Sequence, residues 1–360
     1  MMMNWLLDTG RRRTGTILCA PTLGLPLLLV ATGSVAMGQT TAPGRYAPTQ
    51  VAPREHAAYV LPDGTVQVVT YSGLAGVVRA LNELYVSTHG GVKFSVLEGD
   101  NYSAMAALTF DRTAIAPLGT EYTRIGLGDN LKIAAEPVGF RIAHASLKAG
   151  TRVPALGVIV NPANPVTSLS MGQLTRMFAV GGPAGDIARW GQAGVNGPLA
   201  EREVHPMGPL PSDYLDSEDP QAGEFLSTEK MNGLNMNHSY IGMARYADVV
   251  QRVGEDPAAI GIAALNVQLG NVKIVPLKWT EAGSPSQGNA ADIAAGRYPL
   301  DRYVYIYLRI GKGMPLDAFA KEYMRMVLST EGQRVIAGEA SGYIPLNEGE
   351  LGQERAKLNQ

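Results

Sequence analysis

The sequence predicts an α/β fold, and two observations support this prediction. Short apolar strands alternate with helical segments along the first third of the chain, with strands expected at residues 66–70, 92–97 and 113–118. The composition is 46% hydrophobic and 17% charged, with 42 Gly and 23 Pro residues, which suits a chain with substantial cores and many short loops. Alternation of strand and helix favours a mostly parallel sheet whose loops gather at the carboxyl ends of the strands.

A helix is expected between the first two strands, over residues 74–86. Its apolar side chains recur at helical spacing and share one face, at Leu74, Val77, Val78 and Leu81. A second helix follows the turn at residues 98–101. Both helices would begin at the carboxyl end of a strand.

The second half of the chain continues this alternation. Residues 156–160 form an apolar strand that is expected to leave a first lobe, and Ser170 is a candidate N-cap for the helix that follows. Tyrosine alternates with aliphatic residues over 303–308, which indicates a strand, and a helix is expected over 318–328.

We therefore expect two lobes, each a mostly parallel sheet flanked by helices, joined by two crossings. Residues 62–155 with 305–348 would form the first lobe, and residues 156–304 the second. The alternative is one continuous doubly wound domain.

The chain ends are expected to lie outside the lobes. Three arginines at positions 11–13 precede an apolar run and small residues at 36–38, so residues 1–38 are expected to be a cleaved signal peptide, with an uncleaved anchor as the alternative. Residues 39–61 are expected to be a flexible N-terminus and 349–360 a C-terminal tail. Cys19 is the only cysteine, so the mature chain would contain no disulfide.

Several function classes find no support in the sequence. The net charge of −2 argues against a nucleic-acid partner. The five histidines lack metal-site spacing, and neither a nucleophile motif nor a phosphate-binding glycine loop occurs. We expect no metal, no cofactor and no catalytic residues.

Several segments in a shared order resemble one family. Residues 159–166 and 169–178, then 256–261, and finally 303–308 with 343–346, are similar to phosphate-type periplasmic solute-binding proteins of ABC transporters. This resemblance implies a two-lobed α/β periplasmic-binding-protein fold of type II. It further implies a periplasmic, monomeric binding protein, not an enzyme, that holds phosphate or a similar small anion and delivers it to an ABC permease in the inner membrane.

The resemblance also indicates which loops would hold the ligand. Unpaired N–H groups at helix starts suit an anion. The candidate ligand-binding residues lie in four loops: Ser72, Gly73 and Leu74; Asn101, Tyr102 and Ser103; Gly119 and Thr120; and His205 with Ser212. For Ser72 and for the second loop, simple helix capping is the alternative.

The third and fourth loops depart from the family pattern. The third lacks the expected Asp, and Ala222 stands where the fourth should have a hydroxyl. The acidic run from Asp213 to Asp219 is interpreted as a solvated surface loop. Two alternatives therefore stay open: a divergent paralogue that binds a less charged small molecule, and a secreted or sensor-coupled protein without a role in transport.

Overall fold

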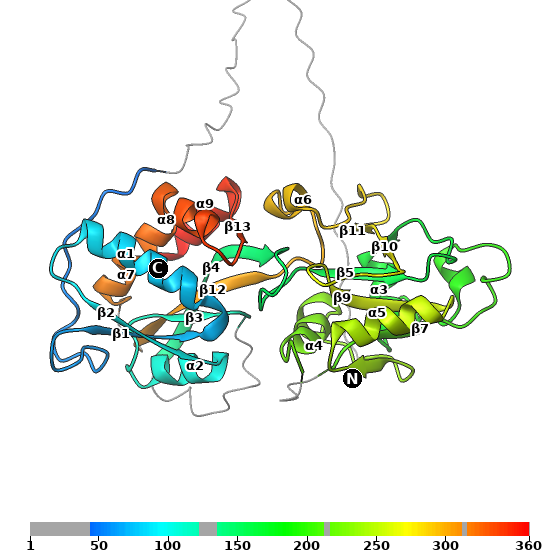
Figure 1. The fold of residues 1–360 in the computed structure, drawn as a ribbon, viewed down its shortest axis with the longest axis horizontal. Helices are drawn as coiled ribbons and strands as arrows, with labels where there is room; N and C mark the ends of the chain where they lie inside the picture. The colour runs from blue at the N-terminus through cyan, green and yellow to red at the C-terminus, as the bar shows by residue number, and fades with distance from the viewer. Residues whose placement is uncertain (1–43, 122–134, 212–216, 312–314, 360) are drawn as a thin grey trace, which may run out of the picture. The chain divides into compact units, whose positions relative to one another are not determined.

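The computed structural model describes residues 44–121, 135–211, 217–311 and 315–359. The described chain has a two-lobed α/β architecture, as predicted (Figure 1). Two large hydrophobic clusters define the lobes. One draws its buried residues from positions 145–300, and the other from positions 57–153 and 304–358.

The first lobe is built from both ends of the described chain, and Figure 1 shows its blue-to-cyan and orange-to-red elements together. Its elements are β1 (Val66–Tyr71), a 3-10 turn (Ser72–Leu74), α1 (Ala75–Thr88), β2 (Phe94–Gly99), α2 (Asn101–Thr109), β3 (Ala116–Leu118), β4 (Ala135–Ser146), β12 (Tyr303–Gly311), α7 (Ala318–Val327), α8 (Thr330–Gly338), β13 (Tyr343–Pro345) and α9 (Glu348–Lys357).

The second lobe is one continuous stretch of chain. Its elements are β5 (Leu156–Val160), β6 (Leu169–Ser170), α3 (Met171–Phe178), a 3-10 turn (Trp190–Ala193), β7 (His205–Pro209), α4 (Ala222–Phe225), a π-helical turn (Leu226–Lys230), β8 (Ile241–Met243), α5 (Tyr246–Glu255), β9 (Ala259–Ala264), β10 (Lys273–Val275), β11 (Leu277–Lys278) and α6 (Ala290–Ala294).

Strand pairing is mixed, which corrects the expectation of mostly parallel sheets. In the first lobe β1 and β2 are parallel, but the four-stranded sheet β13-β4-β12-β3 is antiparallel at every pair. In the second lobe β9, β7 and β8 are parallel, whereas β5 pairs antiparallel with β9 and β10. The reason is the crossing geometry: β4 carries the chain out of the first lobe and β12 brings it back, so the two strands run in opposite directions.

Local sequence signals account for several helix starts. Ser170 caps α3 as predicted, because its hydroxyl accepts a hydrogen bond from the Gln173 amide at 3.1 Å while the Gln173 side chain accepts from the Ser170 amide at 3.0 Å. The predicted apolar face of α1 is buried at Val77, Val78 and Leu81. These helices therefore form where capping and periodicity agree.

The predicted lobe boundaries differ from the elements in three places. The limit between 304 and 305 falls inside β12, because Tyr303 already pairs with His144 of β4. Residues expected to form a tail belong to α9, where buried Glu354 accepts a hydrogen bond from Arg141 Nε at 2.6 Å. Charged pairing of this kind holds a helix on its sheet even when the helix surface is polar.

The third difference concerns the N-terminal segment. Its described part, residues 44–61, lies along α7 and α8, whereas we expected a flexible chain. Glu322 of α7 accepts hydrogen bonds from the Tyr46 hydroxyl at 2.7 Å and from the Thr49 amide at 2.9 Å, and Glu331 accepts from the Tyr46 amide at 2.9 Å. The expected signal peptide at 1–38 lies outside the described residues.

Candidate functional site

Three of the predicted ligand loops converge at the carboxyl ends of the first-lobe strands. Tyr71, the last residue of β1, is the register partner of Gly99, the last residue of β2. Gly119 follows β3, and its amide donates a hydrogen bond to Asn101 Oδ1 at 2.9 Å. The structure therefore brings the loops around Ser72, Asn101 and Gly119 together.

The first loop presents one free hydroxyl. Ser72 is exposed, and its side chain has no hydrogen-bond partner among the described residues. The Leu74 side chain is fully buried in the first-lobe core, so only its backbone amide is suited to bind a ligand. Gly73 accepts a hydrogen bond from the Tyr343 hydroxyl at 3.1 Å through its carbonyl.

The second loop is organised as a helix cap. Asp100 Oδ1 accepts hydrogen bonds from the Ser103 amide and the Ser103 hydroxyl, both at 2.6 Å. Asn101 is buried and engaged with Gly119, whereas Tyr102 is exposed. The capping alternative thus accounts for Asp100 and Ser103, and Asn101 joins two loops.

The third loop offers less to a ligand than its position suggests. The Gly119 amide is already paired with Asn101. Thr120 was predicted as a ligand contact because of its hydroxyl, and this side chain is half-buried. Among the described residues of this loop, Thr120 supplies the side-chain donor.

The ring of Tyr71 lies against two of the loop glycines. A Cβ atom added to Gly73 would be 2.6 Å from Tyr71 Cε1 and 2.8 Å from Arg152 Cβ, and one added to Gly119 would be 2.8 Å from Tyr71 Cε1. Glycine is therefore required at both positions for this close approach. Burial raises the pKa of the Tyr71 phenol, the charge of Asp219 raises it further, and Arg152 and Arg302 lower it.

The second lobe contributes a buried ion pair. Arg302, just before β12, donates to Asp219 through two nitrogens, at 2.5 and 3.3 Å, and both side chains are almost fully buried. Asp219 also accepts a hydrogen bond from the Tyr246 hydroxyl at 2.9 Å, and the Phe225 ring centroid lies 5.3 Å from the guanidinium carbon. Burial lowers the pKa of Arg302, but the charge of Asp219 outweighs it, so the pKa is raised.

The fourth loop therefore differs from the interpretation as a solvated surface. Glu218 accepts a hydrogen bond from the Tyr246 amide at 2.5 Å, at the start of α5, and Asp219 neutralises Arg302. Ser212, Asp213 and Asp216 lie outside the described residues. The interpretation is wrong for Asp219, which is buried and paired with Arg302, whereas Glu218 is exposed, as expected of a solvated loop.

His205 is not brought to the group of loops. It begins β7, whereas the segment with Asp219 follows the other end of that strand at Pro209. Its Nδ1 lies 2.5 Å from Asp256 Oδ2, so its partner is a carboxylate of the second lobe. This contact accounts for a histidine at position 205 without any role in ligand binding.

A second buried charged cluster joins β4, β12 and α9. His144 Nδ1 lies 2.6 Å from Asp301 Oδ2, and its Nε2 lies 2.9 Å from Glu350 Oε2. Burial lowers the pKa of His144, but the two carboxylates outweigh it and raise the pKa to about 9. Burial raises the pKa of Asp301, whereas the contact with His144 leaves the pKa of Glu350 lowered. The imidazolium form is therefore the one that fits this cluster.

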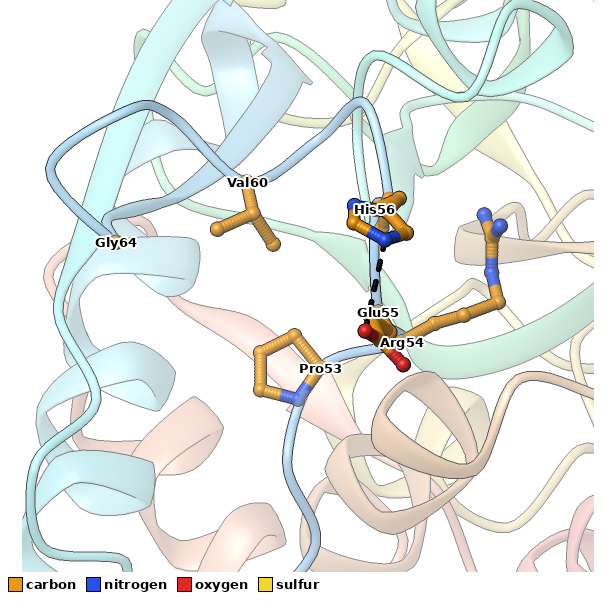
Figure 2. Close-up of a pocket in the computed structure, with 7 residues that line it drawn as sticks. Pro53, Arg54, Glu55, His56, Val60 and Gly64 are labelled. Atoms are coloured by element: carbon orange, nitrogen blue, oxygen red, sulfur yellow. Dashed lines mark ion pairs between the residues drawn. The ribbon is translucent and has the colours of Figure 1, made fainter.

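A surface pocket lies apart from the predicted ligand residues. It has a volume of about 370 Å³ and is lined by residues between Pro53 and Gly64, among them Val60 (Figure 2). Glu55 and His56 form its exposed ion pair at 3.5 Å. No predicted ligand-binding residue contributes to it.

The described residues contain neither a membrane-spanning helix nor a metal-binding cluster. None of their helices combines the length and the apolar character that a membrane crossing needs. Within the same ranges, no group of three His, Cys, Asp or Glu side chains is arranged to hold a metal ion.

Comparison with solved structures shows that the chain shares its two-lobed α/β fold with proteins of known structure. An ABC-type phosphate transport receptor from Vibrio cholerae matches with a TM-score of 0.50 and 18% identity, covering 78% of this chain and 99% of the receptor. PstS from Borrelia burgdorferi matches with a TM-score of 0.51 and 14% identity, covering 79% of this chain and 99% of that protein. The predicted fold class is confirmed.

Two proteins with similar sequences are both named as the phosphate-binding protein PstS. The phosphate-binding protein PstS of Pseudomonas aeruginosa PAO1 is 26% identical over 287 residues, which is 79% of this chain and 83% of the relative. PstS of strain UCBPP-PA14 matches equally. No protein-family model matches the chain. The resemblance to phosphate-type solute-binding proteins is thus confirmed, and both relatives are phosphate-binding proteins by name.

Sequence reasoning missed the charged residues that act on Tyr71, namely Asp219, Arg302 and Arg152. Arg302 and Asp219 are 83 positions apart, so no local motif joins them. The only signal was the charged pair Asp301-Arg302 at the entrance to an apolar strand, where buried charges require partners. No sequence feature marked Arg152 as a site residue.

Proposed function

We propose that this protein is an exported, periplasmic solute-binding protein that captures phosphate or a related small anion and delivers it to an ABC permease in the inner membrane. The observation that carries this proposal is the similarity to PstS over 79% of the chain, joined to a fold shared with a phosphate transport receptor. The converging loops add the donors that such a ligand needs. Export by a cleaved signal peptide over 1–38 and a monomeric state belong to the same proposal.

The proposed contacts are selected by the geometry of the loops. Ser72 keeps a free hydroxyl next to the amides of Gly73 and Leu74, and Thr120 follows the third strand. A desolvated anion needs several such donors at once. Ser103 is a weaker candidate because its hydroxyl already donates to Asp100.

One specific observation favours a second candidate ligand. Asp219 neutralises Arg302, and Asn101 occupies the Gly119 amide, so two donors suited to an anion are already engaged. A divergent paralogue that binds a less charged small molecule would need fewer cationic donors. In a sensor-coupled role the protein would bind the same ligand, but its partner would be a sensor and not an ABC permease.

A ligand screen tests the proposed function. Thermal unfolding and calorimetry are measured with inorganic phosphate, with phosphonates and with neutral metabolites. A ligand present at 100 times its Kd raises the free energy of unfolding by about 2.7 kcal/mol. Stabilisation by millimolar phosphate supports the proposal, whereas stabilisation by a neutral metabolite alone selects the second candidate. Neighbouring permease and ATPase genes would favour transport over a sensor.

A further inference from the structure

Two side chains beside the first ligand loop, Arg152 and Tyr71, have donors without a partner among the described residues. Arg152 is exposed and forms no ion pair or hydrogen bond with any described residue. The Tyr71 hydroxyl likewise has no hydrogen-bond partner in the described part of the chain. Side chains with unused donors beside a predicted ligand loop are candidates for ligand contacts.

Backbone geometry ties Arg152 to the first loop. A Cβ atom on Gly73 would lie 2.8 Å from Arg152 Cβ and 2.6 Å from Tyr71 Cε1, so the Arg152 side chain begins beside this glycine and the Tyr71 ring packs against it. Val153, the next residue, is equally close to Gly119 of the third loop. The segment that leaves β4 therefore borders two ligand loops.

The local balance of charge singles out Arg152. Three charged groups act on the Tyr71 hydroxyl: Asp219, Arg152 and Arg302. Asp219 and Arg302 neutralise each other through two hydrogen bonds. Arg152 is thus the cation of this group that forms no ion pair with any residue in the described ranges.

We propose that Arg152 and Tyr71 bind the ligand directly, with Arg152 supplying the positive charge and the Tyr71 hydroxyl a hydrogen bond to a small oxyanion. Arginine suits this role because its planar guanidinium donates two parallel hydrogen bonds to an oxyanion. It also explains how the site tolerates a fourth loop that lacks the family hydroxyl. This inference rests on the proposed function.

The test compares four variants with wild type by calorimetric titration of inorganic phosphate. Arg152→Met is expected to weaken phosphate binding about 10- to 100-fold, since it removes hydrogen bonds to a charged group. Arg152→Lys keeps the charge and should recover part of the affinity. Tyr71→Phe is expected to weaken binding about fivefold. Arg334→Met, which changes an exposed arginine of α8, is the control and should bind as wild type.

Each outcome decides one question. Phosphate binding by wild type with an unchanged Kd in Arg152→Met overturns this inference and leaves the proposed function standing. No binding by wild type at millimolar phosphate overturns the proposed function and the inference with it. Thermal unfolding in the absence of phosphate shows that each variant is folded, and the exposed position of Arg152 makes this the expected result.

Discussion

At the scale of single residues, Asp219 and Arg302 form a buried ion pair whose disruption is expected to be costly. Both side chains are almost fully dehydrated, and the carboxylate accepts two hydrogen bonds from the guanidinium and one from Tyr246. Removing one partner of such a pair leaves a buried charge without compensation. An ion pair on the surface, such as Arg79 with Glu98, is solvated in either case.

We expect Asp219→Asn to lower the free energy of unfolding by about 3–5 kcal/mol, because Arg302 stays buried without its counter-charge. Glu98→Gln, the matched control on the surface, should cost no more than about 1 kcal/mol. Urea denaturation of both variants measures the difference. Equal losses would contradict the assignment of Arg302 as a buried, paired cation.

The candidate site shows which residues the sequence was able to reveal. Ser72, Asn101 and Gly119 follow apolar strands, and that position alone predicts that their loops meet. Arg152 and Asp219 lie in turns whose surroundings depend on chain segments far away, so their roles follow only from tertiary contacts. His205 was predicted from proximity in sequence to the fourth loop, but β7 separates the two.

At the scale of elements, the crossing strands and α9 are joined through His144. β4 contributes this histidine, Asp301 precedes β12, and Glu350 comes from the first turn of α9. Tyr303 of β12 donates its hydroxyl to Glu350 at 2.7 Å. Three elements thus depend on one protonated imidazole.

The raised pKa of His144 predicts a pH dependence of stability. The pKa rises from 6.5 to about 9 on folding, so the stabilisation is fully present below about pH 6.5 and is lost as the pH rises through about 9. The shift corresponds to about 3 kcal/mol. Urea denaturation between pH 6 and 9.5 should show wild type losing its advantage over His144→Gln across this range.

The control for this titration is His56→Gln, since His56 is 91% exposed and has no buried partner. The difference in free energy of unfolding between His56→Gln and wild type should not vary with pH. Asp301 and Glu350, the charged groups that face His144, are kept in both variants. A constant difference between wild type and His144→Gln over the whole range would contradict a protonated His144.

Strand pairing is the element-level property that the sequence did not predict. Apolar runs and capping residues identified β1, β2, β5 and β12, together with the start of α3. Whether two strands pair parallel or antiparallel depends on where the chain re-enters the sheet, and β12 re-enters the first lobe beside β4. Periodicity reports which residues are buried and carries no information about that choice.

At the scale of the whole molecule, the two lobes have separate hydrophobic cores. Phe178 is fully buried in the second-lobe cluster, and Phe319 is equally buried in the first. Cores that share few contacts can lose stability independently. Truncation of one aromatic ring should therefore have a local effect.

We expect Phe178→Ala to destabilise the second lobe by about 3–5 kcal/mol through the cavity it creates. Hydrogen exchange should show amides of β5 and β9 losing protection while those of β4 and β12 keep it. Phe319→Ala is the matched variant and should give the reverse pattern. Equal loss of protection in both lobes from either variant would contradict separate cores.

The split construction of the first lobe also fixes an order of events while the chain is being made. His144 emerges early, but its partner Asp301 follows 157 positions later, and Glu350 later still. At synthesis rates of about 5–20 residues per second, this delay is on the order of ten seconds or more. The second lobe is continuous in sequence and can therefore fold first. During this delay the apolar faces of β1 and β4 stay exposed to solvent.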